Sequence, residues 1–155
     1  MIESLKTRIL EEELKSFDWK NFEKIVQEIF EANGFIVKRN FRFKTKRKYE
    51  IDLIAVKEWF NFCVDCKRLG KGRYKKSEII KAAIKQEERT EELKKFLGKN
   101  LIAKESLKVK SMRFYPLLVT LFEEEVVKEK EGGTFVVPIW KLNSFLNEVE
   151  SYILV

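Results

Sequence analysis

The chain has 155 residues, 45% of them hydrophobic and 37% charged, which is enough length and apolar material for one domain with a buried core. It contains no histidine, and this excludes the Ser/His and Cys/His schemes of nucleophilic catalysis. It also has no run of about 18 apolar residues and no apolar signal-peptide stretch at its N-terminus, so we expect a cytoplasmic protein that does not cross a membrane.

Periodicity and turn residues divide the chain into helices and strands. Apolar residues at helical spacing predict two N-terminal helices, the second capped by Asp18 and ended by Asn33 and Gly34. Short β-rich runs follow, with a hairpin turn at or near Lys57 and Glu58. In chain order the predicted elements are helices 2–14 and 19–32, strands 35–38, 41–43, 51–56 and 60–65, helix 77–97, strands 109–122 and 134–139, and helix 142–154.

The order of these elements predicts an α/β fold. The runs 117–122 and 134–139 are almost continuously apolar, which is typical of strands that are buried on both faces. We therefore expect a single domain with a mixed central β-sheet flanked by helices. Within it, 1–16 would form an N-terminal helical extension, 17–140 the core and 141–155 a C-terminal helix.

Two acidic residues stand in apolar, β-rich surroundings. Asp52 lies in the run 51–56 and Asp65 in the run 59–66, where an unpaired carboxylate is expensive to bury and needs a compensating cation. If these runs form an antiparallel hairpin, the start of the first strand lies beside the end of the second, and the two carboxylates are neighbours. Lys67 follows Asp65 by two residues, so on an extended chain both side chains project from the same face.

This set has the chemistry of a divalent metal site. Two carboxylates and the peptide carbonyl of Cys66 offer the hard oxygen ligands that Mg²⁺ or Mn²⁺ prefers. Such an ion can neutralise charge on a phosphodiester and activate a water molecule, while the Lys67 ammonium group points at the water or the phosphate. The alternative is that both aspartates only form surface salt bridges with nearby lysines.

The two cysteines do not form a second site. Cys63 and Cys66 make a single Cys-x-x-Cys pair, so a tetrahedral zinc site would lack half of its ligands. A redox-active pair normally opens a helix, whereas this pair closes a strand pattern. We interpret both as buried, inert strand cysteines.

The spacing of Asp52, Asp65 and Lys67 resembles the active-site pattern of the PD-(D/E)xK nuclease superfamily, and is closest to its Mrr-like and archaeal Holliday-junction-resolvase branches. The resemblance covers about 19–139 and implies the restriction-endonuclease-like fold, a Mg²⁺ or Mn²⁺ cofactor and phosphodiester hydrolysis. It implies the two aspartates as metal ligands and Lys67 as a catalytic lysine. Those branches often add a glutamate early in the helix before the sheet, which implies Glu23 as a fourth catalytic residue that also assists at the metal.

Three positions depart from the superfamily pattern. Ile51 stands where a proline is expected before the first acid, and Asp65 stands where glutamate is commoner; both changes leave the ligand set intact. RecB-type members carry Gln-x-x-x-Tyr on the helix after the lysine, whereas this chain has Gln86 followed by Thr90. Gln86 is therefore an accessory candidate. The sequence holds no winged-helix region of the Mrr type, so we expect substrate selection by this domain or a partner.

Positive charge is concentrated around the two acids. The segment 38–81 holds 15 basic and five acidic residues, a net charge of +10, and the remainder carries −3. A basic field around a few acids suits a phosphodiester polyanion, here DNA; a solvated lysine-rich surface, or an edge strand kept soluble by charge, is the alternative. The candidate DNA-binding residues are Arg39, Arg42, Lys44, Lys46, Arg47 and Lys48 on the predicted edge strand, and Arg68, Lys71, Arg73 and Lys75 on the loop after Lys67.

The sequence therefore predicts a Mg²⁺-dependent deoxyribonuclease, an endonuclease with Glu23, Asp52, Asp65 and Lys67 as its catalytic residues. Two alternatives stay open: a catalytically inactive nucleic-acid-binding module with the same fold, and an interaction protein whose acidic helices contact a partner. The pattern does not decide between duplex DNA, branched DNA and RNA. Because two strands need two active sites, a homodimer is the expected assembly.

Overall fold

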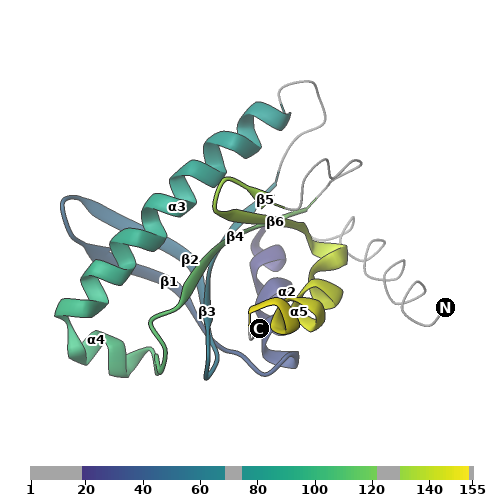
Figure 1. Cartoon of the computed structure of the whole chain (residues 1–155). Helices are drawn as coiled ribbons and strands as arrows, with labels where there is room; N and C mark the ends of the chain where they lie inside the picture. The colour runs from purple at the N-terminus through teal and green to yellow at the C-terminus, as the bar shows by residue number, and fades with distance from the viewer. Residues whose placement is uncertain (1–18, 69–74, 122–129, 154–155) are drawn as a thin grey trace.

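A six-stranded mixed β-sheet forms the middle of the molecule (Figure 1). The computed structural model describes the backbone of residues 19–68, 75–121 and 130–153, and the side chains of 21–68, 76–121 and 132–149. Across these ranges no helix is long and apolar enough to cross a lipid bilayer. The elements are α2 (Trp19–Ala32), β1 (Ile36–Lys44), β2 (Lys48–Val56), β3 (Asn61–Lys67), α3 (Lys75–Lys99), α4 (Leu101–Ser106), β4 (Phe114–Thr120), β5 (Lys130–Glu131), β6 (Thr134–Pro138) and α5 (Ile139–Ile153).

The sheet combines an antiparallel half with a parallel centre. Its strand order is β1-β2-β3-β4-β6-β5. Strands β1, β2 and β3 pair antiparallel, β3 pairs parallel with β4, β4 pairs parallel with β6, and the short β5 pairs antiparallel with β6. The long α3 makes the crossover that two parallel neighbours, β3 and β4, require.

Helices cover both faces of this sheet. α2 and α5 pack on one face, where Phe22 and Leu146 share a core cluster with Phe62 of β3. α3 crosses the other face, where Leu93 packs in a second cluster with Ile54 of β2. Since both faces are buried, the central strands are apolar along their length rather than alternating. Together with the comparison reported below, this confirms the expected fold class.

The β1–β2 hairpin twists halfway along its length, so that the side chains facing α2 in one half face α3 in the other. Leu53 packs on the α2 face of the sheet, whereas Ile51, which strict alternation would place on the same face, packs on the α3 face. Asn40 lies opposite Asp52 in the register and has a φ of 52°, a left-handed conformation that asparagine tolerates better than most residues. The hairpin therefore coils at Asn40 and Asp52, and its outer half reaches across to α3.

Most predicted elements occur close to their expected positions. α2 has the predicted bounds, and α3 contains the predicted helix 77–97. The predicted strands 35–38 and 41–43 are one strand, β1, because pairing continues past the left-handed Asn40. The predicted helix 2–14 lies outside the described residues.

Three local predictions were wrong. The strand expected at 109–122 begins only at Phe114, because 109–113 is a loop that places Val109 in the core but does not belong to the sheet. The short helix α4 and the two-residue β5 have too little periodicity to be recognised. The last helix begins at Ile139, directly after β6, so it starts three residues earlier than predicted.

Candidate active site

The two predicted acids lie where the sheet forks. The β2–β3 pairing ends with Leu53 opposite Val64, so Asp52 and Asp65 are the next positions in register. Beyond this point β2 continues only beside β1, and β3 continues only beside β4. The backbone N–H of Cys66 donates a hydrogen bond of 2.9 Å to Asp52 Oδ2. The carboxylate of Asp52 thus replaces the missing strand partner and is held next to the end of β3.

Asp65 carries a buried carboxylate between two cations. Its exposed fraction is 7%, and its Oδ2 accepts no hydrogen bond from any residue that the structure describes. Lys67 Nζ lies 3.7 Å from Oδ2, and Arg89 Nη1 of α3 lies 3.8 Å from Oδ1. Burial, followed by the charge of Asp52, raises the pKa of Asp65 to about 7, although the two cations oppose this shift. Two adjacent carboxylates are therefore under-compensated in the protein alone.

The donor set fits a hard divalent cation. Asp52 and Asp65 offer oxygens at neighbouring positions, and the buried Oδ2 of Asp65 has no hydrogen-bond partner among the described residues. A divalent cation would remove the electrostatic cost that raises the Asp65 pKa. No group of three His, Cys, Asp or Glu side chains within the described ranges could by itself hold a metal ion. Further ligands would come from a peptide carbonyl, water or substrate, as is usual for Mg²⁺.

Glu23 lies near the acids but is paired elsewhere. Its Oε2 is 3.2 Å from Arg39 Nη2 of β1, and its side chain is 16% exposed. Burial raises the pKa of the Cys66 thiol well above its usual range, and the charges of Asp52, Asp65 and Glu23 raise it further. The charges of all three carboxylates therefore act on the Cys66 thiol, while Glu23 itself is paired with Arg39.

Both cysteines are free and buried. Cys66 packs in the core cluster on the α2 face, so its thiol points away from Asp65, which alternates to the α3 face. Burial raises the pKa of Cys63 to about 12. Neither thiol is available as a thiolate, which agrees with inert strand cysteines.

A family model described as restriction endonuclease, Mrr_cat, matches residues 14–94, more than half of the chain. The chain belongs to this family. The match confirms the resemblance to the PD-(D/E)xK superfamily in its Mrr-like form, and it spans Glu23, Asp52, Asp65 and Lys67. Among curated proteins, an uncharacterized protein of Archaeoglobus fulgidus is 29% identical over 136 residues, covering 87% of this chain and 94% of the relative.

One solved structure supports the restriction-endonuclease-like fold of this family member. The small subunit of the heterodimeric restriction endonuclease R.BspD6I superposes with a TM-score of 0.54 at 10% identity, covering 97% of this chain and 87% of the subunit. At that identity the likeness concerns the fold alone. A crystal structure of a protein of unknown function has a TM-score of 0.49 at 21% identity; the match covers 83% of this chain and 65% of that one.

Helix α3 contributes two side chains to the site of this family member, Gln86 and Arg89. Gln86 is fully buried and donates from Nε2 to the Cys63 carbonyl at 2.8 Å, while Arg89 Nη1 lies 3.2 Å from Gln86 Oε1. Gln86 was an accessory candidate; Arg89 was not identified. A usable signal was present, because polar residues at positions 86 and 90 occupy the buried face of a helix, where they need polar partners.

Four of the six predicted DNA-binding residues of the hairpin, those nearest its turn, fall into two groups. Lys46 and Arg47 pair with Glu88 of α3 at 3.3 and 2.7 Å, and Lys46 also pairs with Glu92 at 3.5 Å. Lys44 and Lys48, which face each other in the register, have no ion-pair partner in the described part of the chain. The first group fastens the hairpin to α3, and the second is free to meet a polyanion.

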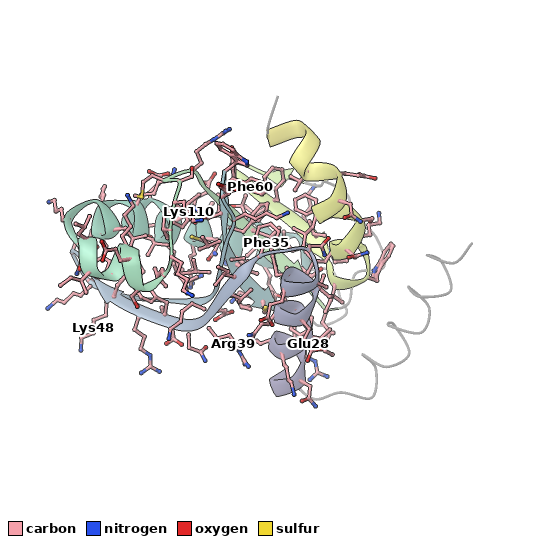
Figure 2. The ribbon with its side chains drawn as sticks, turned by 90° about the horizontal axis from the view of Figure 1, so that it is seen from below. Glu28, Phe35, Arg39, Lys48, Phe60 and Lys110 are labelled. Carbon is pink, nitrogen blue, oxygen red and sulfur yellow. The ribbon has the colours of Figure 1, made fainter. Side chains whose placement is uncertain are left out.

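The outer face of this hairpin continues toward the acids. Figure 2 shows Arg39 and Lys48 projecting on the same side of the β1–β2 ribbon, on the side where α2 lies. Arg42 stands between them on β1 and is exposed, with its Nε 3.2 Å from Glu50. Arg68 is also exposed, directly after Lys67. Of the loop residues predicted to contact DNA, Lys71, Arg73 and the side chain of Lys75 lie outside the described residues.

Proposed function

We propose that this protein is a Mg²⁺- or Mn²⁺-dependent deoxyribonuclease that cuts DNA internally. One observation carries the proposal: Asp52 and Asp65 are adjacent at the sheet fork, with the Lys67 ammonium group 3.7 Å from Asp65. Burying two carboxylates side by side costs free energy unless a cation joins them, so the arrangement is understandable as a cation site. Membership of a restriction endonuclease family supports the same reaction class.

Each residue has a distinct role in this proposal. Asp52 and Asp65 hold the divalent cation, with the Cys66 carbonyl as a further oxygen ligand. When bound, the cation supplies charge neutralisation at the phosphate and acidifies water. Lys67, which is partly exposed, orients the attacking water or takes its proton. Glu23 assists from the α2 side once its carboxylate leaves Arg39.

DNA is the proposed substrate, and a second copy of the chain is the proposed partner. The R.BspD6I small subunit belongs to a heterodimeric enzyme, which supports the idea that one such domain works beside another. A duplex has two strands and each needs an active site, so a homodimer would cut both. The single-domain assignment with 17–140 as its core is part of the same proposal.

The direct test is cleavage of linear, branched and single-stranded DNA by the purified protein with Mg²⁺ or Mn²⁺. We expect cutting that EDTA stops, and we expect Asp52→Asn to lower it at least about 1,000-fold. Asparagine is the better substitution than alanine here, because its amide oxygen can still accept the Cys66 N–H bond. A protein that cuts none of these substrates and binds no metal contradicts the proposal.

The hairpin makes a separate prediction about DNA affinity. We expect the double variant Lys44→Ala, Lys48→Ala to bind duplex DNA about tenfold more weakly, because two phosphate contacts are lost. For the same reason, the slope of log K against log salt concentration should be less steep by about 2. Fluorescence anisotropy at several salt concentrations measures both. The control removes Lys99 and Lys110; Figure 2 shows Lys110 on the opposite side of the ribbon. Equal losses in both doubles would show that only net charge matters.

A catalytically inactive nucleic-acid-binding module is the second candidate function. It is favoured by the pairing of Glu23 with Arg39, which keeps a third carboxylate away from the two aspartates. Mn²⁺ titration separates the two candidates. Measurable Mn²⁺ affinity that is absent from an Asp52→Asn variant supports the enzyme, whereas DNA binding without any Mn²⁺ affinity supports the inactive module.

A further inference from the structure

Arg89 is a cation at the two acids that no sequence motif identified. It stands on α3 with Nη1 3.8 Å from Asp65 Oδ1 and 3.2 Å from Gln86 Oε1. Its side chain is 26% exposed, so the guanidinium group meets solvent on one side. In the described part of the chain its Nε and Nη2 make no hydrogen bond. Among the described residues Arg89 therefore uses one of its nitrogens, Nη1, and keeps the others available.

Gln86, which accepts the hydrogen bond from Arg89 Nη1, is held rigidly. Gln86 is fully buried, and its Nε2 donates to the Cys63 carbonyl of β3 at 2.8 Å. Its peptide oxygen accepts a 2.8 Å hydrogen bond from Thr90 Oγ1 one turn later. The Nε2 bond to Cys63 fixes the side-chain amide with its Oε1 toward Arg89. The guanidinium is thus anchored at one edge, while its contact with Asp65 is a longer ion-pair distance without a hydrogen bond.

Charge balance indicates what Arg89 does when a metal is present. The ionised side chains of Asp52, Asp65, Lys67 and Arg89 sum to zero, and a divalent cation brings the total to +2. A cation at Asp65 repels Arg89, since both compete for the same oxygens. A phosphodiester carries one negative charge and gains a second as hydroxide attacks, so a site with two positive charges stabilises the transition state more than the substrate.

We propose that Arg89 leaves Asp65 when the divalent cation binds, pivots on Gln86, and donates from its free edge to the phosphate group at which the bond is cut. This rests on the proposed nuclease function and adds a phosphate-binding residue to it. The planar guanidinium fork matches two phosphate oxygens, which a lysine ammonium group cannot do in the same geometry. Arg89 would then touch the reacting group and qualify as a catalytic residue.

Two variants test this role against a simple supporting role for Asp65. Arg89→Met keeps an unbranched apolar side chain and removes the charge; Arg89→Lys keeps the charge and loses the fork. We expect kcat/KM for DNA cleavage to fall about 100-fold in the first and about tenfold in the second. Mn²⁺ affinity, measured by calorimetry without DNA, should rise about fivefold in Arg89→Met, because a competing cation has gone.

A binding measurement gives a readout that does not depend on turnover. In a Lys67→Met background, which prevents cleavage, Arg89→Met should weaken duplex DNA binding about tenfold with Mn²⁺ and leave it unchanged in EDTA, where Arg89 stays on Asp65. The matched control is Arg113→Met. Arg113 likewise donates to a neutral side chain, Tyr115 at 2.8 Å, but it lies just before the first residue of β4, whereas Asp65 pairs near the C-terminal end of that strand. It should change neither quantity.

The outcomes separate this inference from the nuclease proposal. If Arg89→Met loses Mn²⁺ affinity in parallel with cleavage, Arg89 only positions Asp65 and the inference is wrong. It is also wrong if DNA binding falls equally with Mn²⁺ and in EDTA, or if the wild type cuts DNA and both Arg89 variants match the Arg113 control. If Arg89→Met does not fold, Arg89→Lys is the test. A fall of about tenfold in its kcat/KM supports the inference, and an unchanged kcat/KM contradicts it. A wild type that neither binds Mn²⁺ nor cuts overturns both proposals.

Discussion

Asp65→Asn is expected to abolish both Mn²⁺ binding and DNA cleavage while making the metal-free protein more stable. The first effect follows because the substitution removes one of the two adjacent carboxylates and leaves a neutral amide, which is a poor ligand for a hard cation beside a single aspartate. We expect cleavage to fall at least about 1,000-fold and calorimetry to detect no Mn²⁺ binding. The fold should survive, because the residue is almost isosteric.

The gain in stability follows from the pKa of Asp65. Burial and the Asp52 charge raise this pKa to about 7, so the folded state holds a proton that the unfolded state, with its ordinary pKa of 3.8, has lost. Ionising Asp65 therefore costs folding free energy in full above about pH 7, and the cost disappears as the pH falls toward 4. It amounts to about 4 kcal/mol at most for a shift of this size.

Urea unfolding in EDTA measures this difference. At pH 8 the Asp65→Asn protein should have the larger free energy of unfolding, and the gap should close by about pH 4. Mn²⁺ should raise the stability of the wild type and leave that of the variant unchanged. A variant that is less stable than the wild type at pH 8 would contradict the view that the carboxylate is under-compensated.

Lys67→Met is expected to abolish cleavage without weakening Mn²⁺ binding. Lys67 lies 3.7 Å from Asp65 Oδ2 and its side chain is 41% exposed, so it can reach a water molecule or a phosphate outside the buried carboxylate. A positioned ammonium group that orients or deprotonates water contributes about 100- to 10,000-fold to a rate. We expect kcat to fall by that amount, with Mn²⁺ affinity unchanged or slightly tighter.

Comparison with Lys67→Arg shows which property of the side chain matters. Arginine keeps the positive charge and cannot give up its proton, so it should fail to restore cleavage if Lys67 acts as a base. Single-turnover kinetics with saturating protein isolate kcat from DNA binding. If Lys67→Met cuts DNA at close to the wild-type rate, the lysine has no role in the reaction and serves only to balance Asp65.

The sequence alone was sufficient for the strand hairpin that carries the acids. Apolar runs around Asp52 and Asp65, separated by a short turn, leave few ways to fold locally, and the antiparallel register then makes the two positions neighbours. The helix bearing Glu23 was predictable for the same reason, since its apolar residues repeat with helical spacing. These features depend on contacts between residues close in the chain.

The partners of the basic side chains in 38–81 could not be predicted from the sequence. A net charge of +10 over 38–81 is a property of the sequence, but it does not reveal which cations already have partners. Lys46 and Arg47 pair with Glu88, 41 or more residues later on α3, and Arg39 pairs with Glu23 on α2. Such pairs arise only after the hairpin has coiled against the helices.

What the sequence by itself determined about this protein is the set of chemical groups and their order: two acids on neighbouring strands, a lysine two residues on, and an excess of positive charge. Only the tertiary structure decided how those groups are engaged. It turned the hairpin over at Asn40, tied Glu23 to Arg39, and brought Arg89 to Asp65. The physical reason is that local patterns specify backbone conformation, whereas the partners of a charged side chain depend on the packing of distant elements.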